Sequence, residues 1–211
     1  ELPEFKRAVL EVLRQPLEER HIRISRSRMT VEFPASFIFV AAMNPCPCGY
    51  YNHPQKQCTC LPWQIKKYLS KISGPLLDRI DLHVEVTPVP FDALVEKKKG
   101  EKSAEIRKRV LQAREIQHQR FRSENEVYVN AQMSSGQIAK YCSIDKNGHQ
   151  LLKTAMERLG LSARAYHRVL KVARTIADLE ESSEIRITHL SEAILLRSLD
   201  RDTWGEVGLH G

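Results

Sequence analysis

The sequence lacks a long hydrophobic run. Its longest apolar stretch is Phe37–Met43, whereas a helix that crosses a bilayer needs about 20 consecutive apolar residues. No secretory signal peptide is visible either, because the chain opens with the charged mixture ELPEFKR. We therefore expect a cytoplasmic protein with no membrane partner.

An initiating methionine is also missing, since the chain begins at Glu1. We expect a piece of a longer protein whose first part was left out by design or lost to proteolysis. Acidic residues do not balance the basic ones: 26 Asp and Glu face 33 Lys and Arg, for a net charge of +7. This excess favours a polyanionic partner such as nucleic acid or nucleotide, and it is equally typical of a basic surface without a specific ligand.

Cysteines are few, but they are clustered. Four of the five lie between Cys46 and Cys60, and the fifth, Cys142, stands alone in a helical pattern. In a cytosolic protein we expect reduced thiols rather than disulfides, and we expect Cys142 to serve only in packing.

The first ninety or so residues mix helical and extended patterns. Pro3–Glu19 has apolar residues at helical spacing, and two alternating runs joined by Arg26-Ser27-Arg28 predict a β-hairpin. Phe37–Ala42 is continuously apolar, as expected of a strand buried on both faces of a parallel sheet. Trp63–Lys71 predicts a short helix, and the alternating run Leu82–Val86 predicts a further strand.

The rest of the chain predicts an all-helical bundle. Ser162 and Thr188 are residue types that cap helix N-termini, and each precedes a helical pattern. The expected helices cover Glu101–Arg122, Ser134–Tyr141, Gly148–Leu159, Ala163–Leu179 and His189–Ser198.

Three local strings carry a resemblance to a known family. They are FPASFIFVAAMNPCPCG (Phe33–Gly49), SGPLLDRID (Ser73–Asp81) and LSARAYHRVLKVARTIADL (Leu161–Leu179). In this order, along nearly the whole chain, they resemble the magnesium-chelatase-related AAA+ ATPases, in particular the YifB/ComM branch. The resemblance implies an α/β fold for residues 1–92, as the latter part of an AAA+ P-loop NTPase domain, and an all-α helical lid for residues 93–211. It places the nucleotide-binding Walker A loop upstream of this chain.

The resemblance implies catalytic roles for three residues. Glu1 matches the second acidic residue of the Walker B motif, which polarises the attacking water, and Asn44 matches the sensor 1 asparagine that holds this water. Arg79 matches an arginine finger, whose guanidinium stabilises the phosphoryl group bound by a neighbouring subunit. Taken alone, Asn44 before a proline is a common turn former, and Arg79 is as well explained by an ion pair with Asp78 or Asp81.

The resemblance also implies that the lid contacts the nucleotide. Arg164 follows the Ser162 cap in the first helical turn and matches sensor 2, which reaches from the lid to the nucleotide. Arg168 lies on the same helical face one turn later and is the second candidate. Without the resemblance, both would be read as part of a solvated helical face.

The loop after Asn44 departs from the general AAA+ pattern but is similar to this branch of the family. Cys46 and Cys48 form one C-x-C pair, and Cys58 and Cys60 form another nine residues later. Four thiolates could enclose a tetrahedral Zn²⁺ that stabilises a loop with little core of its own, and His53 could replace one of them. Reduced or redox-active thiols in a surface loop are the alternative.

The predicted hairpin carries Arg23, Arg26 and Arg28. In related ring ATPases, hairpins that precede the sensor 1 strand project toward a central pore. Arginines there could bind DNA phosphates without reading the base sequence. A solvated hairpin tip, or a subunit boundary, would account for the same residues.

The resemblance thus implies an ATP-driven ring motor, expected to be a hexamer, which uses ATP and Mg²⁺ to remodel DNA in a helicase or branch-migration reaction. This chain alone, without its phosphate-binding loop, is expected to hydrolyse no ATP. One alternative is a magnesium-chelatase-type motor subunit that acts on partner proteins. A second alternative is a non-enzymatic, zinc-stapled DNA-binding module.

Overall fold

The structure is a computed structural model, and it describes residues 1–86, 88–89 and 100–197. The chain divides into two compact units, the first comprising Glu1–Ile80 and the second beginning at Asp81. The domain boundary expected between residues 92 and 93 lies outside the described residues. Within them, no helix has the length and apolar character needed to cross a membrane.

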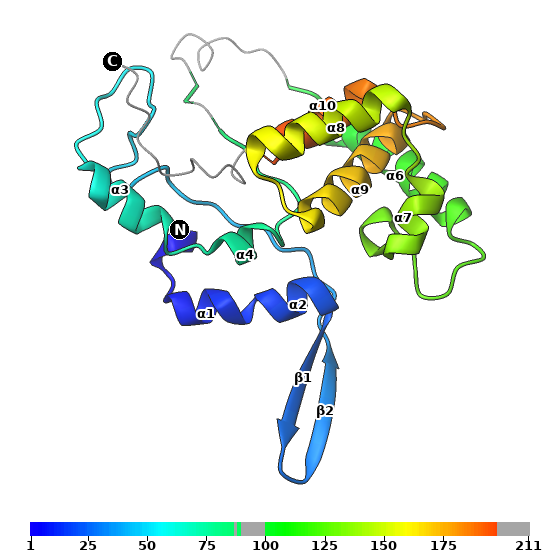
Figure 1. Cartoon of the computed structure of the whole chain (residues 1–211), viewed down its shortest axis with the longest axis horizontal. Helices are drawn as coiled ribbons and strands as arrows, with labels where there is room; N and C mark the ends of the chain where they lie inside the picture. Colours follow the sequence, from blue (N-terminus) through cyan, green and yellow to red (C-terminus); the bar gives the residue numbers. More distant parts are fainter. Residues whose placement is uncertain (87, 90–99, 198–211) are drawn as a thin grey trace. The chain divides into compact units, whose positions relative to one another are not determined.

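The first unit opens with three short helical segments instead of the single helix expected for residues 3–19. The 3-10 turn η1 (Leu2–Glu4) precedes α1 (Arg7–Val12) and α2 (Arg14–Glu19). Pro16 explains the break between α1 and α2, because proline has no N–H to donate to the carbonyl one helical turn earlier. The two helices follow one another closely, as Figure 1 shows.

The predicted β-hairpin is confirmed. β1 (His21–Arg26) pairs with β2 (Met29–Pro34) in an antiparallel register. At its base, the N–H of Ala35 donates to the carbonyl oxygen of Arg20 at 2.8 Å. The hairpin extends away from α2 (Figure 1), and it is the only sheet in the part of the chain that the structure describes.

The strands expected at Phe37–Ala42 and Leu82–Val86 are not formed. Both segments lack regular structure, and Ile38 and Val40 are 92% and 86% exposed. A strand of a parallel sheet needs neighbours that complete its hydrogen bonds and cover its apolar faces. No such neighbour lies among the described residues, so the prediction of a parallel sheet is wrong for them.

In the described part of the first unit, two further helices follow: α3 (Pro62–Leu69) and α4 (Gly74–Leu77). Ser73 caps α4, since its hydroxyl accepts the N–H of Leu76 at 3.3 Å. One small core lies beside α1 and α4, and a second lies beside α3 and the cysteine-rich loop. The buried residues of the first are Leu2, Leu10, Ile72, Leu76 and Leu77, and those of the second are Cys46, Ile65, Tyr68 and Leu69.

The second unit is helical, as predicted. Helix α9 (Ala163–Leu179) has the predicted bounds, and Ser162 caps it by accepting the N–H of Ala165 at 3.1 Å. α9 contacts α6, α7 and α10, and Cys142 is buried in the helical core as expected. The remaining elements are α6 (Ser103–Arg120), η2 (Asn130–Gln132), α7 (Ser135–Tyr141), α8 (Lys146–Leu159) and α10 (Ile187–Leu195).

The cap predicted at Thr188 is wrong. α10 begins at Ile187, so Thr188 lies inside its first turn. The capping contact comes instead from His189, whose Nδ1 accepts the N–H of Arg186 at 3.0 Å. The other imidazole nitrogen, Nε2, lies 2.9 Å from a carboxylate oxygen of Glu180, so the ring joins the helix start to the chain that precedes it.

Candidate nucleotide and metal sites

The structure places Glu1 and Asn44 on neighbouring segments of the first unit. The N–H of Leu2 donates to the carbonyl oxygen of Ala42 at 2.9 Å, which fixes the start of the chain beside the segment that leads to Asn44. Both Glu1 and Asn44 are exposed. Their side chains are therefore accessible to a nucleotide, as the roles of water polarisation and water binding require.

Tyr68 of α3 lies beside the same two segments. Its side chain is buried, and burial raises its pKa, as do the nearby charges of Glu4 and Glu1. The backbone of Asn44 acts on this pKa in the opposite direction. We call Glu1, Leu2, Ala42 and Asn44 the Asn44 corner.

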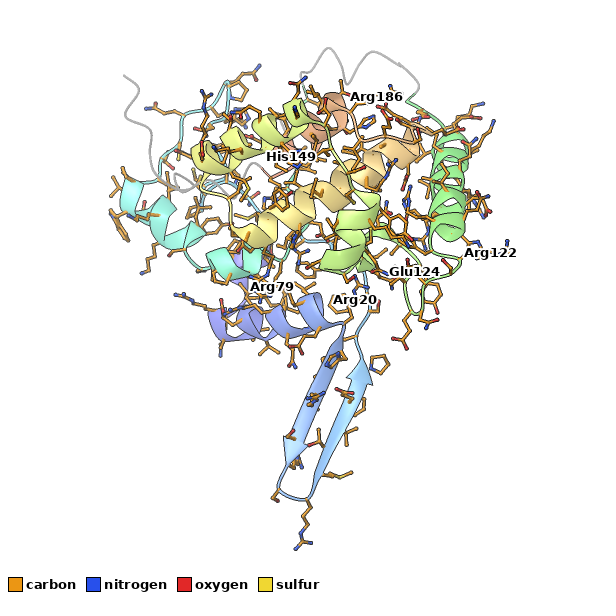
Figure 2. The ribbon with its side chains drawn as sticks, turned by 45° about the vertical axis from the view of Figure 1, so that its right-hand side comes forward. Arg20, Arg79, Arg122, Glu124, His149 and Arg186 are labelled. Atoms are coloured by element: carbon orange, nitrogen blue, oxygen red, sulfur yellow. The ribbon has the colours of Figure 1, made fainter. Side chains whose placement is uncertain are left out.

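Arg79 is engaged within its own unit. Its Nη1 donates to the carbonyl oxygen of Pro75 at 2.7 Å, and its Nε lies 3.2 Å from a carboxylate oxygen of Glu18 in α2. Figure 2 places it where α4 approaches α1 and α2. Arg79 therefore has an intrachain ion-pair partner in Glu18. An arginine finger would have to exchange this pair for phosphate.

The two lid arginines differ in their surroundings. Arg164 is exposed in the first turn of α9, whereas the side chain of Arg168 is only 14% exposed and pairs with the carboxylate of Asp81. Asp81 therefore pairs with an arginine of its own unit. Between the two candidates, Arg164 has the more accessible guanidinium.

The four cysteines of the loop converge on one point. The Sγ atoms of Cys46, Cys48, Cys58 and Cys60 all lie within 4.8 Å of one another, and three of the separations are 3.4, 3.5 and 3.7 Å. A tetrahedral ion with Zn–S bonds of about 2.3 Å would space its sulfurs about 3.8 Å apart. These residues, called the four-cysteine cluster below, therefore fit a tetrahedral metal ion. All four are free thiols.

Backbone N–H groups point at the sulfurs of this cluster. The N–H of Tyr51 donates to Cys46 Sγ at 3.3 Å. Donors at Tyr50 and Thr59 lower the pKa of Cys48 to about 5. Such N–H donors stabilise thiolate charge, which is the form that binds metal.

The neighbouring thiols of the cluster resist ionisation. The N–H of Cys60 acts to lower the pKa of Cys58, but burial and hydrogen bonds with Cys48 and Cys46 outweigh it and raise this pKa to about 12. Four adjacent thiolates would need a cation to balance their charge. His53 is not part of the cluster, and its Nδ1 accepts the N–H of Gln55 at 3.0 Å.

The arginines of the hairpin are not equivalent. Arg23 in β1 faces Glu32 in β2, and its Nε and Nη2 donate to one carboxylate oxygen at 3.0 and 2.5 Å. Arg26 and Arg28 lie at the turn and are exposed. Across the strands Arg26 faces Met29, and Arg28 lies in the turn, so neither of these two predicted DNA contacts has an acidic residue opposite it as Arg23 has.

Comparison with known proteins decides the family. Residues 1–94 match the profile of magnesium chelatase subunit ChlI, and residues 100–197 match that of the C-terminal part of the same subunit. The chain belongs to the magnesium-chelatase-like (YifB/ComM) family. It is 46% identical over 202 residues to competence protein ComM of Haemophilus influenzae. It is 43% identical over 203 residues to the uncharacterized protein YifB of Escherichia coli.

Each of these alignments covers 95% of this chain but 38% of the relative. The chain thus spans about two fifths of the length of the curated relatives it matches. A more distant relative in this magnesium-chelatase-like family, uncharacterized protein Rv2897c of Mycobacterium tuberculosis, is 36% identical over 197 residues.

One polar feature of this family member was not predicted from the sequence. Asp178 of α9 is fully buried and accepts hydrogen bonds from Arg120 at 2.5 and 2.7 Å, from Arg174 at 3.1 Å and from Asn130 at 2.7 Å. We call these four residues the Asp178 network. A sequence pattern could have predicted this network. Arg174 and Asp178 lie four residues apart, on one helical face, among the small apolar residues of the α9 core face.

Proposed function

We propose that the intact protein is an AAA+ ATPase that takes Glu1 and Asn44 from one subunit and Arg79 from a neighbouring subunit. The observation that supports this most strongly is the Asn44 corner, where Glu1 and Asn44 lie on neighbouring, hydrogen-bonded segments. In this function Glu1 polarises the attacking water, Asn44 holds it, and Arg79 stabilises the charge that develops on the phosphoryl group. ATP and Mg²⁺ bind with the help of residues outside this chain.

Exposed apolar residues support the proposed domain organisation. Ile38 and Val40 project from the segment that precedes Asn44 with no cover from the described residues, and a soluble protein rarely leaves such a run open. We propose that the rest of the intact protein supplies the neighbouring strands, so that residues 1–92 complete an α/β domain. Residues 93–211 then form its helical lid, with Arg164 reaching the nucleotide and Arg168 as the second candidate.

The proposed substrate is DNA, remodelled by a ring of subunits, most simply a hexamer. Arg26 and Arg28 support this proposal because they are exposed at the turn of the hairpin, where phosphates of either strand are accessible to them. Arg23 contributes less to DNA binding, because Glu32 balances its charge. Branch migration is the reaction that we propose for the ring.

We also propose Zn²⁺ as the ion of the four-cysteine cluster. Four sulfur ligands and no open position are typical of structural zinc. Cys46, Cys48, Cys58 and Cys60 would hold the ion, which would supply cross-linking of the loop and no step of hydrolysis.

ATP hydrolysis by the intact protein, measured with and without branched DNA, tests this function. The proposal predicts turnover that DNA stimulates, and it predicts no turnover by the 211-residue chain alone. Stimulation by porphyrin-binding partner proteins, with none by DNA, would favour a chelatase-type motor instead. DNA binding by an intact protein that hydrolyses no ATP would favour a zinc-stapled binding module.

A further inference from the structure

The first half of α6 is exposed on every side. Each residue from Ser103 to Gln112 is exposed, and burial in the helical core begins only at Ala113. Because packing contributes little to this stretch, its helical conformation depends on its good helix formers, which include alanine, leucine, lysine and arginine. This half of the helix is therefore open to a partner.

Two of the five Lys and Arg residues of α6 are balanced by carboxylates of the same chain. Arg109 donates hydrogen bonds to both carboxylate oxygens of Glu101, at 2.5 and 3.0 Å. Arg120 donates to the buried carboxylate of Asp178 within the Asp178 network. The charge of these two arginines is thus neutralised inside the chain.

The other three basic residues share one face of the helix. Arg107, Lys108 and Arg114 lie within about a third of the helix circumference, and Arg114 follows Arg107 by two turns, or about 10 Å. All three are exposed, and none forms an ion pair with a carboxylate in the part of the chain that the structure describes. Leu111 lies between them and is 56% exposed. We call Arg107, Lys108, Leu111 and Arg114 the α6 basic face.

The nearest glutamates do not neutralise the α6 basic face. Glu105 and Glu115 flank it along the helix, and neither pairs with it among the described residues. The carboxylate of Glu115 instead accepts a hydrogen bond from Gln119 at 3.0 Å. Arg122, just past the end of α6 (Figure 2), is exposed and adds a further positive charge. The surface therefore keeps an excess of positive charge, which an anionic partner would balance.

The side chains of the α6 basic face favour a phosphate backbone over an acidic protein. The planar guanidinium groups of Arg107 and Arg114 match phosphate with two parallel N–H donors. Protein interfaces have an apolar core rich in aromatic residues, whereas Leu111 is the one apolar member of this face. A DNA duplex carries one phosphate charge for about every 1.7 Å of its axis, so a basic row about 10 Å long meets several phosphates in any register.

We propose that α6 binds the DNA backbone through Arg107, Lys108 and Arg114, as a second DNA contact besides the turn of the hairpin. This inference rests on the proposed function, in which DNA is the substrate. Phosphate contacts do not read the base sequence, so binding at α6 is independent of sequence and depends on salt. The three residues hold DNA and take no part in hydrolysis.

The test compares three forms of the intact protein. They are wild type, Arg107→Gln/Lys108→Gln/Arg114→Gln, and Lys146→Gln/Lys153→Gln/Arg158→Gln. The last is the matched control, because it removes three exposed basic residues from α8 in the same unit and changes the net charge equally. Glutamine is a good helix former, so both variants should keep their helices, which circular dichroism checks.

For each form we would measure the Kd for a short DNA duplex at several salt concentrations, the Kd for a poly-glutamate peptide, and ATP turnover without DNA. We expect the α6 variant to lower the slope of log Kd against log salt by about 2.7, at about 0.9 for each lost phosphate contact. Its turnover without DNA should stay within about twofold of wild type. The α8 control should keep the wild-type slope.

A wild-type slope in the α6 variant would overturn the inference and leave the proposed function standing. An equal fall of the slope in both variants would also overturn it, since net charge alone would then explain binding. Loss of affinity for poly-glutamate, with none for DNA, would assign the face to acidic proteins instead. If wild-type protein binds no duplex, the proposed DNA substrate fails together with the inference. Wild-type DNA binding without ATP turnover would remove the proposed ATPase, and the slopes would still decide the role of α6.

Discussion

The Nε of Arg79 lies 3.2 Å from a carboxylate oxygen of Glu18 in the same chain. This pair holds the proposed arginine finger against α2, with the guanidinium only 12% exposed. Glu18 is 37% exposed, so solvent screens its side of the pair. An arginine finger would exchange Glu18 for the γ-phosphate of a nucleotide bound by a neighbouring subunit.

Replacement of Glu18 tests whether the pair serves only to hold Arg79. In the intact protein, Glu18→Gln should leave the turnover number for ATP within about twofold of wild type, because the finger itself is unchanged. The matched control is Glu19→Gln, the adjacent glutamate, which does not approach Arg79 in the structure's ion pairs. A loss of turnover in Glu18→Gln alone would assign the catalytic role to Glu18 and contradict the account.

The arginines of the hairpin should contribute unequally to DNA binding. Arg26→Ala/Arg28→Ala should weaken binding by the intact protein and lower the slope of log Kd against log salt by about two, roughly one for each phosphate that is no longer bound. The control is Arg23→Ala/Glu32→Ala, which removes one charge of each sign and should change Kd by less than about twofold. Fluorescence anisotropy at several salt concentrations measures both, and equal effects of the two variants would contradict the assignment.

The Asp178 network should dominate the stability of the second unit. Asp178→Asn removes the negative charge that balances buried Arg174 and Arg120, and should lower the free energy of unfolding by about 3 kcal/mol or more. Glu157→Gln on the exposed face of α8 removes only a 4.0 Å ion pair with Lys153. It should change the free energy of unfolding by less than about 0.5 kcal/mol. Urea unfolding of the 211-residue chain measures both. If Asp178→Asn unfolded at the same urea concentration as wild type, the Asp178 network would not be a stabilising feature.

Glu124 should give the chain a pH-dependent stability. Hydrogen bonds from Tyr141, Lys140 and Gln137 lower its pKa from 4.5 to about 2, and Figure 2 labels it near α7. Because the folded pKa is the lower one, the stabilisation is present above pH 4.5 and is lost as the pH falls through 2. The stability difference between wild type and Glu124→Gln should therefore shrink over this range.

The same titration has an internal check. Tyr141→Phe removes the shortest of the three hydrogen bonds to Glu124, at 2.7 Å, and should narrow the pH range over which stability is lost. Unfolding curves between pH 7 and pH 2 measure the effect. If the stability difference between wild type and Glu124→Gln stayed constant over this pH range, Glu124 would not be the source of the pH dependence.

Elements whose stability is local could be predicted from the sequence. The bounds of α9 and its Ser162 cap follow from helical periodicity and cap chemistry, and the hairpin follows from its alternating runs. The strand expected at Phe37–Ala42 is not formed, because its stability is not local. Its apolar pattern is real, but a strand also needs neighbours that the pattern itself does not supply.

The candidate sites divide in the same way. The convergence of the four-cysteine cluster was predictable, because the two C-x-C pairs close a short loop. The pairing of Arg79 with Glu18 could not be predicted, since it joins the segment just after α4 to a helix about sixty residues earlier.

The most direct test of the account is the turnover number of the intact protein carrying Arg79→Ala, measured together with its Kd for ADP. If Arg79 is the finger, turnover should fall about 1,000-fold, as for other arginine fingers, with ADP bound within about threefold of wild type. Wild-type turnover in this variant would contradict the claim that Arg79 acts on the nucleotide of a neighbouring subunit.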